Sequence, residues 1–133
     1  MKIMGTDVVT LANGSASLAV AGAVTIYTKA INVKPGEFFA LSYKAVSSAG
    51  TPDVKIEMEQ SFQLPATEGA TDATYWAEPE NTNDIEASLT TETIRHKAIN
   101  PVTLPYLRFK ITGAAGNNAD TVCSMWLTKQ EDN

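Results

Sequence analysis

The sequence predicts an all-β chain that folds as a single antiparallel β-sandwich, jelly-roll-like, with about eight strands. The clearest evidence is the segment 53–64, in which Val54, Ile56 and Met58 alternate with charged residues. An apolar interval of two belongs to a strand with one wet face, whereas a helix gathers apolar residues at intervals of three and four. The same alternation recurs in 106–112 and 121–129, and no helical period is sustained elsewhere.

The chain of 133 residues is the right length for one domain, and we expect a single sandwich over 1–133. Segment 7–12 is a strand candidate, and Asn13-Gly14 tolerates the positive φ angles of a tight turn, so 15–20 is expected to pair beside it. The first 22 residues are thus predicted to form an N-terminal hairpin.

The next predicted strand covers 23–33, which is rich in β-branched residues and is followed by a Pro35-Gly36 turn. Segment 38–47 has apolar residues on both faces, which predicts a central strand. After the loop 47–52 comes the amphipathic strand 53–64, in which Phe62 and Leu64 share the apolar parity of Val54.

Segment 65–83 has no period of either kind and is acidic, which predicts a long acidic loop of functional or mobile character. Weaker strands are expected at 85–89 and 93–99. A strong strand begins at Tyr106, after Pro105, because proline cannot donate a ladder hydrogen bond. The closing strand covers 120–129, and the polar tail 130–133 is expected to fray.

The residue types needed for catalysis are sparse. The chain has one histidine, His96, without a nucleophile elbow, and one cysteine, Cys123, whose parity predicts a small core side chain. One of each, far apart, does not make a zinc site, and no glycine loop cradles phosphate. We therefore expect no enzyme activity, no catalytic residue, no metal and no cofactor. The acids Glu78, Glu80, Asp84 and Glu86, with Asn81 and Asn83, could offer oxygen ligands to calcium, but their spacing matches no EF-hand loop and a solvated acidic loop is the ordinary explanation.

Three aromatic residues are the candidate binding residues. Tyr75 and Trp76 lie in the acidic loop, where they could contact a glycan or a protein, or fold back over one end of the sandwich. Trp126 has the opposite parity to Cys123 and Met125, so it should face away from the core. We expect it to lie against another sheet, a loop or a second subunit.

The composition limits the partners. The net charge is -5, with 15 acidic and 10 basic side chains and no basic run, which disfavours nucleic-acid binding. The apolar run 18–24 is far shorter than the ~20 residues of a membrane span, and no convincing secretion signal precedes it. A single cysteine fits a reducing cytoplasm.

From about Ile31 onward the chain resembles the small β-sandwich virion accessory proteins of tailed bacteriophages, the group of capsid decoration, head-fibre and tail-associated proteins. The segments that carry the resemblance are the strand after the Pro35-Gly36 turn, the loop 48–52 with its amphipathic strand, the Tyr75-Trp76 loop, 104–111, and the final strand 121–129.

The resemblance implies a non-enzymatic structural role in a virion assembled in the cytoplasm of a bacterial host. The expected partners are the chain itself, as a homo-oligomer, and capsid or tail proteins. The alternative is a carbohydrate-binding module that uses Tyr75 and Trp76 on a glycan.

Overall fold

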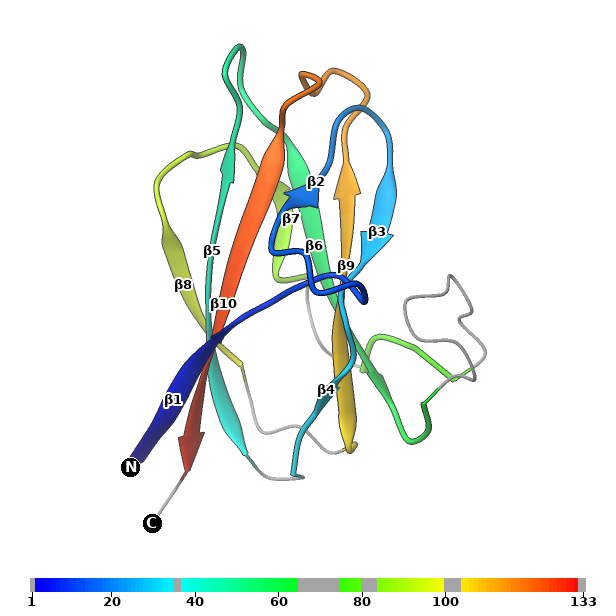
Figure 1. Cartoon of the computed structure of the whole chain (residues 1–133), viewed down its shortest axis with the longest axis vertical. Coiled ribbons are helices and arrows are strands. Elements are labelled where there is room, and N and C mark those ends of the chain that lie inside the picture. Colours follow the sequence, from blue (N-terminus) through cyan, green and yellow to red (C-terminus); the bar gives the residue numbers. More distant parts are fainter. Residues whose placement is uncertain (1, 35–36, 65–74, 80–83, 100–103, 132–133) are drawn as a thin grey trace.

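The computed structural model describes residues 2–34, 37–64, 75–79, 84–99 and 104–131, and in these ranges the chain is all-β (Figure 1). The Pro35-Gly36 turn and positions 65–74 and 80–83 of the acidic loop lie outside the described residues. Ten strands are present in the described ranges. They are β1 (Lys2–Val8), β2 (Leu18–Ala19), β3 (Thr25–Tyr27), β4 (Ile31–Asn32), β5 (Phe38–Val46), β6 (Val54–Ser61), β7 (Glu86–Leu89), β8 (Arg95–Ile99), β9 (Tyr106–Gly113) and β10 (Val122–Glu131).

The strands form two five-stranded antiparallel sheets, as the sequence predicts for a β-sandwich. Sheet A has the order β1-β10-β5-β8 with β2 also paired to β10, and sheet B has the order β3-β9-β6-β7 with β4 also paired to β9. Figure 1 shows sheet A on the left and β3, β4, β6 and β9 of sheet B on the right, with both chain ends together at the foot of sheet A.

The connectivity is that of a jelly roll. Because β1 and β2 share one side of β10, and β3 and β4 share one side of β9, the ten strands fill eight positions. Numbered along the chain, these positions pair first with last, second with seventh, third with sixth and fourth with fifth. A long hairpin rolled onto itself gives this pairing, which is the double Greek key of jelly-roll domains.

The predicted N-terminal hairpin is wrong, although its turn is present. Gly14 has a φ of 87°, and its N–H donates to the Leu11 carbonyl oxygen at 2.9 Å. The two flanking strands do not pair with each other, because both hydrogen-bond to β10. The long partner β10 offers each of them a ladder, so residues 9–17 form a local detour along one sheet edge.

Two smaller predictions at strand ends are also corrected. Strand β6 ends at Ser61, so Phe62 and Leu64 leave the sheet and are 60% and 43% exposed. The tail 130–133 is predicted to fray, but Gln130 pairs with Ile3 and with Phe38, while residues 132–133 lie outside the described residues. The N-terminal strand supplies the partner that extends β10 through residue 131.

The core lies between the sheets and consists of the inward residues that the alternation predicts. Leu41 and Tyr43 of β5 face Ile56 of β6 and Phe109 of β9, and all are at most 2% exposed. Strand β5 lies between β10 and β8, which confirms the central position expected for it. Among the described residues there is no helix long and apolar enough to cross a membrane.

Candidate functional site

Trp126 lies at the middle of β10 on the outer face of sheet A. Its neighbours Met125 and Leu127 point into the core, so the pleat directs the indole outward, as its parity predicts. It pairs across the sheet with Val8 of β1 and Ser42 of β5, and Ser42 pairs in turn with His96 of β8. These four residues form one row across β1, β10, β5 and β8.

The outer face of sheet A has almost no charge. We define the outer face by the outward positions of its strands whose side chains the structure describes. They are Thr6, Val8, Ala19, Phe38, Ala40, Ser42, Lys44, Val46, His96, Ala98, Val122, Ser124, Trp126, Thr128 and Gln130. None of these residues is acidic, although the chain has 15 acids. The outer face is therefore neutral to slightly basic on a protein of net charge -5.

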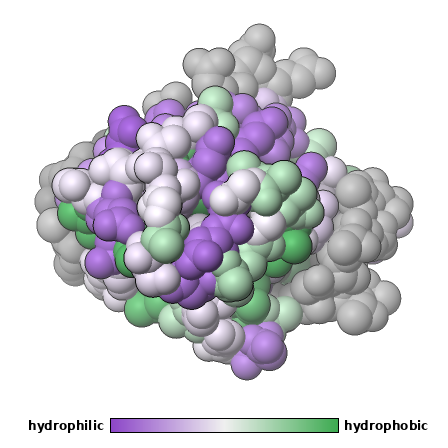
Figure 2. Space-filling view, turned by 90° about the horizontal axis from the view of Figure 1, so that it is seen from above, coloured by the Kyte–Doolittle hydropathy of each residue, from purple (hydrophilic) through white to green (hydrophobic). Residues whose placement is uncertain are grey.

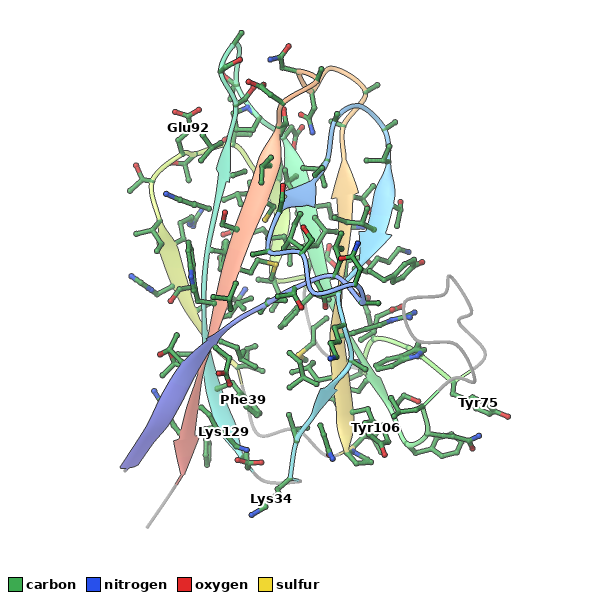
Figure 3. All side chains as sticks on the ribbon, viewed as in Figure 1. Lys34, Phe39, Tyr75, Glu92, Tyr106 and Lys129 are labelled. Atoms are coloured by element: carbon green, nitrogen blue, oxygen red, sulfur yellow. The ribbon has the colours of Figure 1, made fainter. Side chains whose placement is uncertain are left out.

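The nearest charged loops lie at the two ends of sheet A. Glu92 accepts a hydrogen bond from the Ser47 N–H at 3.1 Å at one end, and Lys129 pairs with Glu37 at 3.0 Å at the other. Figure 3 shows Glu92 at the top and Lys129 with Lys34 at the bottom. Figure 2 looks onto the top end, where hydrophilic residues are mixed with neutral ones and hydrophobic residues gather along one side.

The outer face also contains a Ser–His pair, since Ser42 Oγ lies 2.8 Å from His96 Nδ1. A nucleophilic serine needs a base that a third group orients, usually a carboxylate. The described outward positions of the face include no carboxylate. The pair is a surface hydrogen bond between β5 and β8.

Trp76 is placed far from Trp126, over the outer face of sheet B. It is 5% exposed, and its ring lies 4.4 Å from the Arg108 guanidinium carbon. The Tyr27 ring lies 4.2 Å from the same carbon, and Arg108 Nε donates to Glu59 Oε1 at 2.8 Å. Arg108 is 2% exposed, so a charged residue that the sequence places on an outward face is buried by aromatic rings.

The short described segment Tyr75–Pro79, which we call the docked segment, is attached to sheet B by its backbone as well. Gln60 and Ala77 exchange two hydrogen bonds, of 2.9 and 3.2 Å, at the end of β6 that β7 does not reach. Tyr75 is 40% exposed and makes an edge contact with Phe62, with ring centroids 5.4 Å apart.

The sequence groups Tyr75, Trp76 and Trp126 as binding candidates, and the structure divides them between the two sheets. Trp76 covers Arg108, so the face that it presents to Arg108 is not open to a sugar. Tyr75 remains accessible, and Trp126 is partly buried on sheet A. The Arg108 cluster was missed because alternation shows which face a side chain takes but not what covers that face.

Three acids meet beside the docked segment. The carboxylates of Glu57, Glu78 and Asp84 have oxygens within 4.8 Å of one another, and the Lys55 ammonium lies 3.7 Å from Glu57 and 3.8 Å from Asp84. Burial raises the pKa of Glu78 to about 7, and hydrogen bonds and charge repulsion from Glu57 and Asp84 act in the same direction.

Of the calcium ligands considered from the sequence, only Glu78 and Asp84 meet here. Glu86 instead accepts a hydrogen bond from Tyr43 Oη at 2.7 Å and pairs with Arg95 at 3.2 Å, while Glu80, Asn81 and Asn83 lie outside the described residues. Three carboxylates suit a hard cation and offer three ligand oxygens when each binds through one oxygen, against the six to eight that calcium takes.

A small pocket opens at the side of the sandwich between β1 and the β3–β4 connection. Its volume is about 140 Å³, and its polar lining includes Asp7 and Lys29 beside Val9 and Leu127. Pockets for drug-sized ligands run from about 300 Å³ upward, so this one is small for an organic substrate.

No protein-family model matches the chain, and no curated protein matches its sequence.

Proposed function

We propose that the chain is a non-enzymatic structural protein that associates with copies of itself through the outer face of sheet A, and that it serves as a bacteriophage or prophage virion accessory protein attached to capsid or tail. The observation that carries the self-association is the absence of acidic side chains among the described outward positions of this face. Two molecules of net charge -5 repel each other least where neither presents a carboxylate.

The dimensions of the face are adequate for an interface. Four strands at ~4.8 Å spacing and nine residues at ~3.4 Å cover about 20 by 30 Å, or roughly 600 Å². Specific complexes bury about 800 Å² per partner, with weaker ones near 600 Å². Trp126 lies in the central row of this area and is the residue type most enriched among binding hot spots.

The virion role rests on the resemblance and on the fold. Jelly rolls occur in viral capsid proteins, and also in lectins, so the fold alone does not choose between them. An accessory protein that coats a shell needs a flat face for a neighbour and no catalytic group. The outer face of sheet A, with small residues around one tryptophan, is consistent with that requirement. Assembly would take place in the host cytoplasm, on the growing virion.

The test is light scattering on a sizing column over a concentration series. Val8→Asp introduces a carboxylate beside Trp126, at a valine that is 50% exposed. Val24→Asp is the matched control, because Val24 is 40% exposed and lies outside the face. We expect an oligomer in the parent and in the control, and at least ~10-fold weaker association in Val8→Asp.

A parent chain that stays monomeric at all concentrations would contradict self-association. Equal weakening by the two aspartates would show that the location of the charge is unimportant, and would contradict the assignment to sheet A. Circular dichroism on each variant establishes that the chain is folded before its mass is interpreted.

Sugar binding is the second candidate, and the exposed Tyr75–Phe62 pair is the observation that favours it. Exposed rings stack on the apolar faces of sugars. A glycan array with the parent chain tests it, followed by Tyr75→Ala on any positive signal. Loss of the signal in this variant would support a carbohydrate-binding module, and an array without signal would reject it.

A further inference from the structure

The docked segment is held on sheet B by contacts of two kinds. The first kind comprises the Ala77–Gln60 backbone bridge and the stacking of Trp76 on Arg108, neither of which involves a carboxyl group. Glu78, by contrast, is held against the carboxylates of Glu57 and Asp84. Carboxylates in such contact need a proton between them, because two negative charges at this distance repel each other.

Docking also has a cost that makes the segment easy to release. The Trp76 indole Nε1 and the Gln60 Oε1 are buried without a hydrogen-bond partner among the described residues. A buried polar atom left unpaired destabilises the docked state, and the segment recovers that free energy when water reaches the atom. The two unpaired atoms therefore cancel part of the free energy that favours docking, so a modest repulsion at Glu78 can shift the balance toward release.

We propose that the docked segment is a proton-dependent latch, closed when Glu78 shares a proton with Glu57 and Asp84, and loosened when that proton is lost. Opening would uncover Arg108 and Tyr27 on the outer face of sheet B. The inference is independent of the proposed function, because the latch lies on sheet B and the self-association face lies on sheet A.

The charged groups around Glu78 come from several elements. Strand β6 contributes Glu57 and Lys55, and Asp84 precedes β7. Lys110 of β9 lies opposite Glu57 in the strand register, and Lys97 of β8 donates to the Ile85 carbonyl oxygen at 3.1 Å. Lys55 offsets part of the negative charge, but the three carboxylates still outnumber it.

The sign follows from the direction of the pKa shift. The pKa of Glu78 rises from its ordinary value of 4.5 to about 7 when the segment is docked. Docking is therefore fully favoured below about pH 4.5 and weakens as the pH rises through about 7. Each pKa unit that survives solvent screening changes the docking equilibrium tenfold, and we expect a loss on the order of tenfold in total.

The fluorescence of Trp76 reports on the latch. The full chain with Trp126→Phe retains Trp76 as its one tryptophan, since the sequence has two. We expect acrylamide quenching and the emission wavelength to increase between about pH 5 and about pH 9, as the indole leaves Arg108 for water. In the same background Glu78→Gln keeps the side-chain shape but cannot ionise, and its quenching should stay low across this range.

The matched control is Glu92→Gln, which removes one acid at the opposite end of the molecule and should reproduce the parent curve. If quenching of Trp76 in the Trp126→Phe chain did not change between about pH 5 and about pH 9, the proposal would be overturned. A Glu78→Gln curve that rises with the parent curve would overturn it as well, because the transition would then belong to another group.

Discussion

The buried ion pair on sheet B provides the sharpest test of the packing described above. Arg108 and Glu59 lie directly opposite each other on β9 and β6, and their side chains are 2% and 10% exposed. Glu59→Gln keeps an acceptor for Arg108 Nε but removes the counter-charge. The buried guanidinium would then lose the negative charge that lies 2.8 Å from its Nε.

The expected magnitude follows from three contributions. Breaking a buried pair by removing one partner costs about 3–5 kcal/mol. The cost is reduced because the contacts of Arg108 with Tyr27 and Trp76, each worth about 0.5–2 kcal/mol, persist. We expect a loss of about 2 kcal/mol in the free energy of unfolding, against a typical total of about 5–15 kcal/mol.

Urea unfolding followed by circular dichroism measures this loss, and two further variants make it specific. Glu57→Gln changes the same residue type on the same face of β6, but it relieves the repulsion with Glu78 and Asp84. It should therefore be neutral or stabilising at about pH 8. The double variant Glu59→Leu with Arg108→Met removes both charges and should cost less than Glu59→Gln alone.

The reasoning would be refuted if Glu59→Gln cost less than about 0.5 kcal/mol, because the pair would then behave like an exposed ion pair. It would also be refuted if the double variant lost as much stability as the single variants Glu59→Leu and Arg108→Met lose together. Independent contributions of that kind would mean that Arg108 is not stabilised by Glu59.

Two other predictions concern the core and its edge. Gly113→Ala should lower the free energy of unfolding, measured in urea, by at least ~2 kcal/mol. The added Cβ would lie 2.5 Å from the Gly22 backbone oxygen and 2.6 Å from the Val20 backbone oxygen. A loss no larger than that of Gly116→Ala, where the space is open, would contradict this prediction. Burial raises the pKa of the Cys123 thiol to about 12, so we expect an aromatic disulfide reagent to label it at neutral pH only as fast as the chain unfolds; fast labelling of the folded chain would show that the thiol is accessible.

The alternation of apolar residues predicted much of the fold. The inward positions of β5, β6, β9 and β10 follow directly from a period of two, because a pleated strand allows only two faces. The central position of β5 followed from apolar residues on both of its faces. In each case the local sequence records the environment of the strand.

Pairing was harder to predict than strand position. The Asn13-Gly14 turn indicates a reversal, but it carries no information about which partner the next strand meets. Strand β10 is long enough to pair with β1 and β2 in succession, and that long-range competition decides against a local hairpin. Likewise, the outward parity of Arg108 is visible in the sequence, while its burial depends on Trp76 returning to β9 from about thirty residues away.

The two outer faces of the sandwich differ in a way that bears on function. Sheet B presents charged residues from β6 and β9, among them Glu59 and Arg108, and the docked segment of the chain itself covers that pair. Sheet A presents small and uncharged residues around Trp126. Charged residues solvate a sheet face without help, whereas a face with almost no charge and a central tryptophan gains most from a partner. Sheet A is therefore the face on which a second copy would replace the most unfavourable contact with water.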